Sequence, residues 1–227
     1  MRSLLLIAAH VALVAAYGTG PPKGDQEGAA KVCMDMFPVG HGEDARTEAP
    51  PYEIRLDATQ LSLGSPISVK SDQTTYTYFE GVFVQARMAS CGSSEGMEAL
   101  GSFSIAENDT FLQLYSCGKG QMDNAVGHKE ASHQSNITFL WHPPASEPGH
   151  VYFRATVAKN RTHFWTNVFS PFVTDPSDTR SLPQDDAMNN KYCDVRSTLA
   201  GAASSVFALT PLIIAAFVIT NALRVFQ

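Results

Sequence analysis

The sequence predicts an all-β protein, an antiparallel β-sandwich, followed by a C-terminal apolar segment that associates with a membrane. Three observations lead to this prediction: apolar and polar residues alternate along much of the chain, turn-forming residues separate the alternating runs, and both ends of the chain are apolar. Roughly 180 residues lie between the two ends, enough for one domain with its own core.

The N-terminal 16 residues predict a secretory signal peptide. Arg2 supplies the positive charge, residues 4–16 are apolar, and small residues before Ala16 predict cleavage after it. The alternative is a buried core helix, which the shortness of the run disfavours. Residues 17–31 are rich in glycine, proline and charge, and they predict a flexible leader.

The central part, residues 32–174, carries the strand signal. Strict alternation marks residues 52–57, 82–85, 136–141 and 151–157, and glycine or proline separates such runs. We expect about eight or nine short strands, each with one buried and one exposed face, and no helix before the C-terminal segment.

Four cysteines and three glycosylation motifs fit a secreted domain. An even number of cysteines in a secretory chain predicts two disulfides, and four cysteines allow three pairings. The acceptor asparagines are Asn108, Asn136 and Asn160, each followed two residues later by threonine. Asn136 has the opposite parity to Ile137 and therefore points outward, and Asn160 is expected in a loop after a strand.

The C-terminal region predicts a polar stalk and a membrane attachment. Residues 175–202 are rich in aspartate, asparagine and proline, as a stalk would be. Residues 203–223 are apolar and long enough for a membrane-spanning helix. The alternative is a signal for a glycosylphosphatidylinositol (GPI) anchor, with Ser197 near the expected attachment distance.

Several segments together resemble the reeler domain, which occurs in reelin, in ferric-chelate-reductase-like proteins and in insect defence proteins. They are Cys33-x-x-Met36-x-Pro38 with His41-Gly42, Pro51-Tyr52-x-Ile54, the run from Phe79 to Arg87, Gly101-x-Phe103, Cys117, residues 141–144, residues 151–157 and Phe164-Trp165. His41 lies one residue further from Pro38 than the family pattern has it, so this loop is expected to differ.

The resemblance implies an immunoglobulin-like sandwich and a disulfide between Cys33 and Cys117. Cys91 and Cys193 would then pair with each other and tie the stalk to the domain. Ferric-chelate-reductase-like relatives add further domains, including a haem-binding membrane domain that this chain cannot build, so no reductase activity is inferred.

The sequence lacks the motifs that would predict a catalytic or metal site. The sequence has no zinc or serine-nucleophile motif among its seven histidines and its serines, and its net charge of −6 argues against a nucleic-acid partner. We therefore expect no enzyme activity, no cofactor and no metal site. Arg87, at the end of the most specific motif, is either a structural partner of a nearby carboxylate such as Glu80 or a contact on a ligand face.

The sequence thus predicts a membrane-tethered cell-surface glycoprotein that binds an unknown protein or microbial-surface ligand, in innate immune defence or cell adhesion. Two alternatives stay open: a metal- or haem-dependent redox partner, and a coat protein without a soluble ligand.

Overall fold

The structure is a computed structural model of the chain. It describes residues 18–182 except residues 25, 27, 39, 61–64, 72–76, 90–97, 119, 147 and 181. For residues 65–71 it describes the backbone only. The predicted signal peptide, the predicted membrane segment at 203–223, and both Cys91 and Cys193 lie outside the described residues. No helix in the described part of the chain is both long and apolar enough to span a bilayer.

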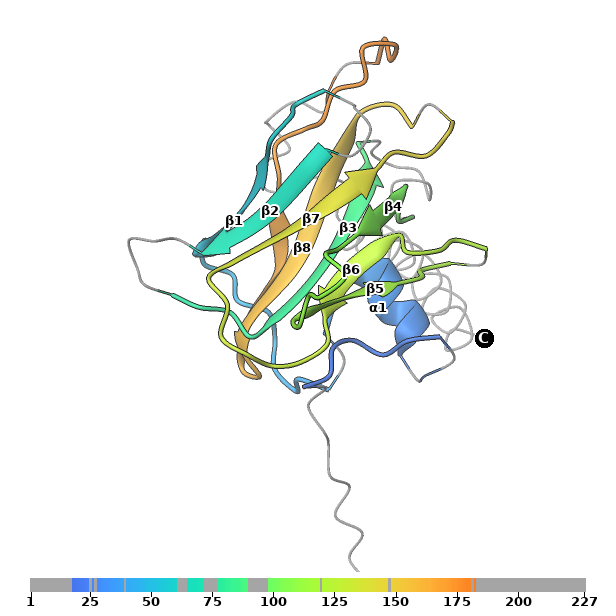
Figure 1. Ribbon diagram of the computed structural model, residues 1–227. Helices are drawn as coiled ribbons and strands as arrows, with labels where there is room; N and C mark the ends of the chain where they lie inside the picture. Colours follow the sequence, from blue (N-terminus) through green and yellow to red (C-terminus); the bar gives the residue numbers. More distant parts are fainter. Residues whose placement is uncertain are drawn as a thin grey trace, which may run out of the picture.

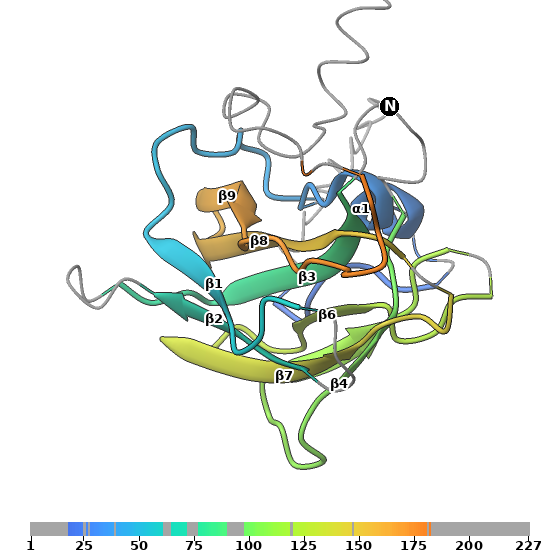
Figure 2. The same cartoon turned by 90° about the horizontal axis from the view of Figure 1, so that it is seen from above.

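The described strands form two antiparallel sheets that face each other, which confirms the predicted all-β sandwich (Figures 1 and 2). The four-stranded sheet has the order β1 (Tyr52–Leu56), β2 (Ser65–Ser71), β7 (Asn136–His142) and β4 (Ser102–Ser104). The five-stranded sheet has the order β5 (Leu112–Tyr115), β6 (Ala125–His128), β3 (Gly81–Met88), β8 (Val151–Asn160) and β9 (His163–Phe169).

The main core lies between the two sheets and is rich in aromatic side chains. On β7 the burial alternates as the sequence predicts, with Ile137, Phe139 and Trp141 buried and the residues between them exposed. The Trp141 indole donates a hydrogen bond to the Leu100 carbonyl over 3.0 Å. Gly101 permits this contact, because its φ is +65° and a Cβ there would lie 2.6 Å from the Trp141 Nε1.

The two long strands of the five-stranded sheet depart from the prediction of one buried and one exposed face. Seven consecutive residues of β3 are buried, and so are the first eight of β8. The outer face of this sheet is covered in part by the helix α1 (Ala29–Asp35), which was not predicted, and by Met36 after it, while Phe169 and Phe172 pack on Tyr152 of β8. Figure 2 shows α1 on the side of the sheet away from the four-stranded sheet.

Helix α1 has seven residues, too few to be stable alone in water. It is held by a second hydrophobic cluster that joins Val32 and Met36 to side chains of β3, β5 and β6. Met36 ends the helix in a left-handed conformation, with φ +59°. Burial against the sheet therefore stabilises α1, and burial is not visible in a local sequence pattern.

The residues before α1 also depart from the prediction, because they do not form a flexible leader. Gln113 on β5 donates through Nε2 to the Thr19 carbonyl over 3.0 Å, and Lys23 Nζ donates to the Leu114 carbonyl over 3.0 Å. Pro22 is buried. The described part of the segment 18–28 thus lies along β5.

The first residues of the predicted stalk, residues 175–180, contact the sandwich in the structure. His150 Nδ1 accepts from the Asp175 amide over 3.1 Å, and His150 Nε2 lies 2.9 Å from the Arg180 carbonyl oxygen. The His150 amide in turn donates to the Asp178 carboxylate over 3.2 Å.

Candidate functional site

The most specific sequence motif, the run from Phe79 to Arg87, holds the C-terminal end of α1. Gln85 and Arg87 point outward from β3, underneath the helix. Gln85 Nε2 donates to the Cys33 carbonyl over 3.0 Å, and the Arg87 guanidinium donates to the carbonyls of Cys33 and Met34 over 3.2 and 3.0 Å. Gln85 Oε1 accepts from Arg87 Nε over 2.9 Å, which fixes both side chains.

Two residues of β8 also bond the end of the helix. We call the four side chains that do so the arginine cradle: Gln85, Arg87, Arg154 and Thr156. Arg154 donates to the Asp35 carbonyl over 3.2 Å, and the Thr156 hydroxyl donates to the Met36 carbonyl. The last carbonyls of a helix have no partner within the helix and carry a partial negative charge. Two buried arginines therefore stabilise α1 by hydrogen bonding and by their positive charge.

Arg87 consequently does not lie on a ligand face, and this interpretation of the sequence is wrong. Its side chain is 1% exposed, and burial lowers its pKa to about 10, with the nearby Arg154 charge acting in the same direction. It remains charged at neutral pH. The alternative pairing with Glu80 is also wrong, because Glu80 Oε1 lies 3.0 Å from His133 Nε2 on the surface.

A disulfide between Cys33 and Cys117 fastens the same helix to the chain after β5. This is the pair that the family resemblance implied. The two cysteines are 84 residues apart, and Gln85 Nε2 lies 3.2 Å from the Cys117 sulfur. The motif on β3 and the disulfide thus act on one feature, the docking of α1 on the outer face of the five-stranded sheet.

A pocket of about 620 Å³ opens beside this helix, and we take it as the candidate binding site. Its lining comes from the segment before α1, from one face of α1, and from β5 with the residues after it. Apolar atoms form most of it, and the lining residues are Pro22, Lys23, Gly24, Ala29, Ala30, Cys33, Leu114, Tyr115, Ser116 and Gly118.

One cationic and one phenolic side chain give this pocket its polar character. The Lys23 ammonium lies 4.4 Å from the centre of the Tyr115 ring, a cation–π contact. Burial lowers the pKa of Lys23, and the Asp123 carboxylate opposes this shift. Burial also raises the pKa of Tyr115, whose hydroxyl donates to the His128 carbonyl over 3.1 Å. The lining thus carries one ammonium, from Lys23, and Tyr115 contributes to it a phenol that is un-ionised at neutral pH and only 4% exposed.

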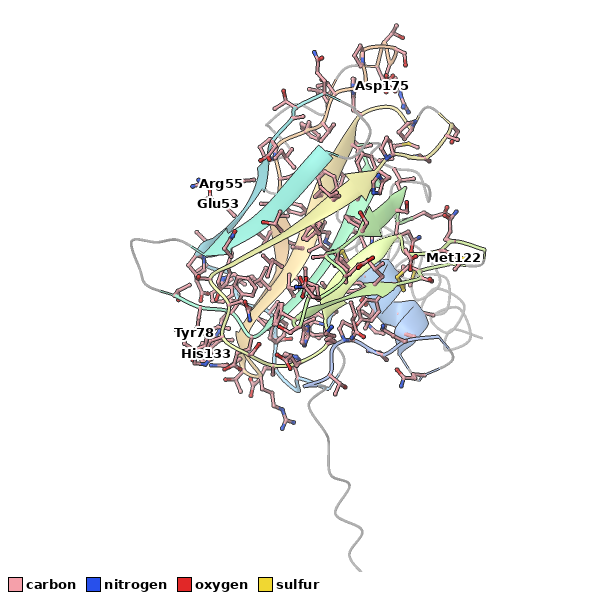
Figure 3. The ribbon with its side chains drawn as sticks, in the orientation of Figure 1. Glu53, Arg55, Tyr78, Met122, His133 and Asp175 are labelled. Atoms are coloured by element: carbon pink, nitrogen blue, oxygen red, sulfur yellow. A yellow bond between two sulfur atoms is a disulfide. The ribbon has the colours of Figure 1, made fainter. Side chains whose placement is uncertain are left out.

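Two methionines are exposed, Met34 on α1 at 49% and Met122 at 75%. Figure 3 labels Met122 on the surface of the molecule. No sequence motif predicted this pocket. The predicted disulfide borders it, since Cys33 lines the pocket and Cys117 is bonded to Cys33.

The predicted glycosylation sites lie on the surface. Asn108 and Asn136 are exposed, and Asn160 is half-buried and is the last residue of β8 rather than a loop residue. Among the residues that the structure describes, no three histidine, cysteine, aspartate or glutamate side chains gather as a metal site requires.

The chain is similar to several known proteins. A family model described as "Reeler domain" matches residues 31–181. A protein of Hyphantria cunea named "Putative defense protein Hdd11" is 32% identical over 73% of this chain and 93% of its own length. A Xenopus laevis protein named "Putative ferric-chelate reductase 1" is 30% identical over 73% of this chain but 26% of its own length. The solved reeler domain of human F-spondin is 18% identical, with a TM-score of 0.45, and the alignment covers 57% of this chain and 91% of that domain.

Proposed function

This chain belongs to the reeler domain family, and from that premise we propose that it is a membrane-tethered extracellular glycoprotein that binds a ligand on a microbial or host surface. Its role would be innate immune defence or cell adhesion. We also propose that its sandwich is immunoglobulin-like.

The extent of the similarity to the defence protein of Hyphantria cunea carries the proposal. The alignment covers 93% of that protein, so the relative consists of little more than the region shared with this chain. Whatever that relative does, it does with this region. The same domain is about a quarter of the ferric-chelate reductase, most of which has no counterpart in the alignment.

The pocket beside α1 is the place where such binding would occur. Two of its walls, α1 and the chain after β5, are joined by the disulfide, and Lys23 of the third wall donates to the Leu114 carbonyl, which favours a pocket that is formed before any ligand arrives. An apolar lining with one ammonium suits a ligand with an apolar part and a negative charge.

The test uses the full-length chain displayed on cultured cells, exposed to fluorescent bacteria, yeast and host cells. We expect binding to at least one of these surfaces. The variant Ala30→Trp, which fills the pocket from the exposed side of α1, should reduce binding at least tenfold. Leu140→Trp is the matched control, because Leu140 is an exposed apolar residue on the other sheet. Absence of binding to every surface, or equal loss in both variants, contradicts the proposal.

The membrane tether is tested on the same cells with phosphatidylinositol-specific phospholipase C. Release of the protein identifies a GPI anchor, and retention at the surface identifies a spanning helix. Failure of the chain to reach the surface contradicts the tether.

The similarity to a ferric-chelate reductase supports a second candidate, a metal- or haem-dependent redox partner. Elemental analysis and an absorption spectrum of the purified chain separate the two functions. A stoichiometric transition metal or a haem band supports the redox partner, and their absence from the purified chain supports the binding module.

A further inference from the structure

The three acceptor asparagines are far apart in the sequence, but strand register brings them to the same end of the sandwich. We call this end the sequon pole and define it by Gly81, where β3 begins, and Asn160, where β8 ends. The two strands are antiparallel, and Gly81 pairs with Ala158. Asn160 itself pairs with His163 at the hairpin that leads into β9.

Asn136 lies at this pole because the residues before β7 pair with the residues before β3. Phe79 and Gln134 exchange two backbone hydrogen bonds of 2.9 Å, and Gln134 precedes Asn136 by two residues. The rings of Tyr78 and His133 stack at 3.7 Å on the surface of the same region (Figure 3).

Asn108 lies at this pole because it shortly precedes β5, the edge strand of the five-stranded sheet, which begins at this end. It lies in a turn three residues before Phe111, whose carbonyl accepts from the Lys129 amide over 2.8 Å. Leu112 on β5 pairs with His128 on β6, and the His128 ring lies 3.2 Å from the Val82 amide at the start of β3.

The C-terminal part of the described chain leaves from the opposite end. Met88, the last residue of β3, pairs with Val151, and Val151 exchanges backbone hydrogen bonds with Val173. The Arg180 guanidinium lies 4.0 Å from the Met88 sulfur. Figure 3 shows Asp175 at the end of the molecule away from Tyr78 and His133. The eight residues of β3 place about 25 Å between the two ends.

Each of the three motifs is accessible in the folded domain. Asn108 and Asn136 are exposed, and so are the three threonines of the motifs, Thr110, Thr138 and Thr162. Asn160 is half-buried, but its Oδ1 is the atom that accepts, from the amides of Thr162 and His163 over 3.0 Å. A glycan attaches to the other side-chain atom, Nδ2.

We propose that all three asparagines carry N-glycans and that these glycans form a cap over the sequon pole, the end turned away from the C-terminal chain. The cap closes this end to large protein partners and leaves the side of the sandwich that bears α1 open. The inference depends on the proposed function in one respect, since it requires that the chain enters the secretory pathway.

Occupancy is tested with the full-length chain expressed in animal cells. Each of the variants Asn108→Gln, Asn136→Gln and Asn160→Gln should migrate one glycan faster, and enzymatic deglycosylation should convert all three asparagines to aspartate in peptide mass spectra. A site that is unmodified in chains that have reached the cell surface contradicts this inference and leaves the proposed function intact. Chains that stay inside the cell and lack every glycan contradict both.

Orientation is tested by energy transfer from dye-labelled glycans to a dye in the plasma membrane. Ser177→Asn is a matched control, because it creates a motif with Thr179 at an exposed position of the opposite end. In a chain whose three native asparagines are changed to glutamine, the glycan from Ser177→Asn should transfer energy several-fold more efficiently than the native glycans do. Equal transfer from the two ends contradicts the inference.

Discussion

At the scale of single residues, Arg87 and Arg154 hold the end of a short helix on the five-stranded sheet. Arg87 and Arg154 are long, charged side chains that the structure buries, and each meets the carbonyl groups at the end of a short helix. A buried cation needs partners that replace water, and helix-end carbonyls supply both oxygen atoms and a partial negative charge. The specificity of the motif that ends at Arg87 therefore reflects the packing of one helix on one sheet.

Replacing Arg87 by methionine keeps the length of the side chain and removes its donors. The carbonyls of Cys33 and Met34 then lose buried partners, and we expect a loss of about 2–4 kcal/mol in the free energy of unfolding. Urea denaturation measures it. Arg55→Met is the control, since Arg55 pairs with Glu53 on the surface and should change stability by less than about 1 kcal/mol. An Arg87→Met chain that is as stable as the natural chain but no longer binds ligand would contradict this structural role and indicate that Arg87 contacts the ligand.

His41 makes the stability of the domain depend on pH. Its Nδ1 is buried without a hydrogen-bond partner, its ring packs on Phe164, and burial lowers its pKa below 6.5, opposed by a backbone hydrogen bond at Arg161. Well above pH 6.5 this side chain is neutral in both states. As the pH falls below 6.5 the unfolded chain takes up a proton that the folded domain resists, so stability falls.

The variant His41→Phe cannot take up this proton, and its loss of stability between pH 7.5 and pH 5 should be smaller than that of the natural chain. Urea denaturation at both pH values measures the difference. The value at pH 7.5 reports the change in packing alone, so it serves as the internal reference. An unchanged loss between the two pH values would show that His41 does not contribute.

At the scale of elements, α1 is the part of the fold that most depends on its surroundings. A helix of seven residues has little stability of its own, and here the sheet, the arginine cradle and the Cys33–Cys117 disulfide hold it together. The helix forms one wall of the pocket, so its docking and the shape of the candidate binding site are coupled.

Removing the disulfide tests this coupling. The double variant Cys33→Ser with Cys117→Ser opens a loop of 84 residues and should lower the free energy of unfolding by about 3–5 kcal/mol. Hydrogen exchange should rise in α1 more than in β8, because the strand is hydrogen-bonded on both sides. Uniform acceleration across the domain would mean that α1 docks independently of the disulfide.

At the scale of the whole molecule, the two ends of the sandwich differ. The sequon pole carries the three acceptor asparagines, and the opposite end carries the last described residues of the chain beside Met88. Met88 precedes Cys91 by three residues, and Arg180 precedes Cys193 by thirteen. The two segments therefore start from neighbouring points.

This placement supports the prediction that Cys91 pairs with Cys193. Peptide mapping of the unreduced protein should find one disulfide-linked peptide that contains both cysteines, and it should disappear on reduction. The variant Cys193→Ser should expose one thiol to labelling, at Cys91. A free Cys91 in the natural protein would contradict the pairing.

The alternation of apolar and polar residues predicted side-chain burial correctly where one face of a strand is exposed to water. On β7 and on the first four residues of β1 the alternation of the sequence matches the alternation of burial. It failed on β3 and β8, because α1 and other segments distant in the chain pack on their outer face, which leaves no exposed side. Nothing local in Ala29–Asp35 shows that this helix will be buried.

The all-β class, the antiparallel sandwich and the family could be predicted from the amino-acid sequence, because alternating polarity and short motifs are properties of consecutive residues. The tertiary structure alone decided the role of Arg87, the pocket beside α1 and the gathering of Asn108, Asn136 and Asn160 at one end. Each of these depends on strand register and on contacts between segments distant in the chain, which local alternation does not specify.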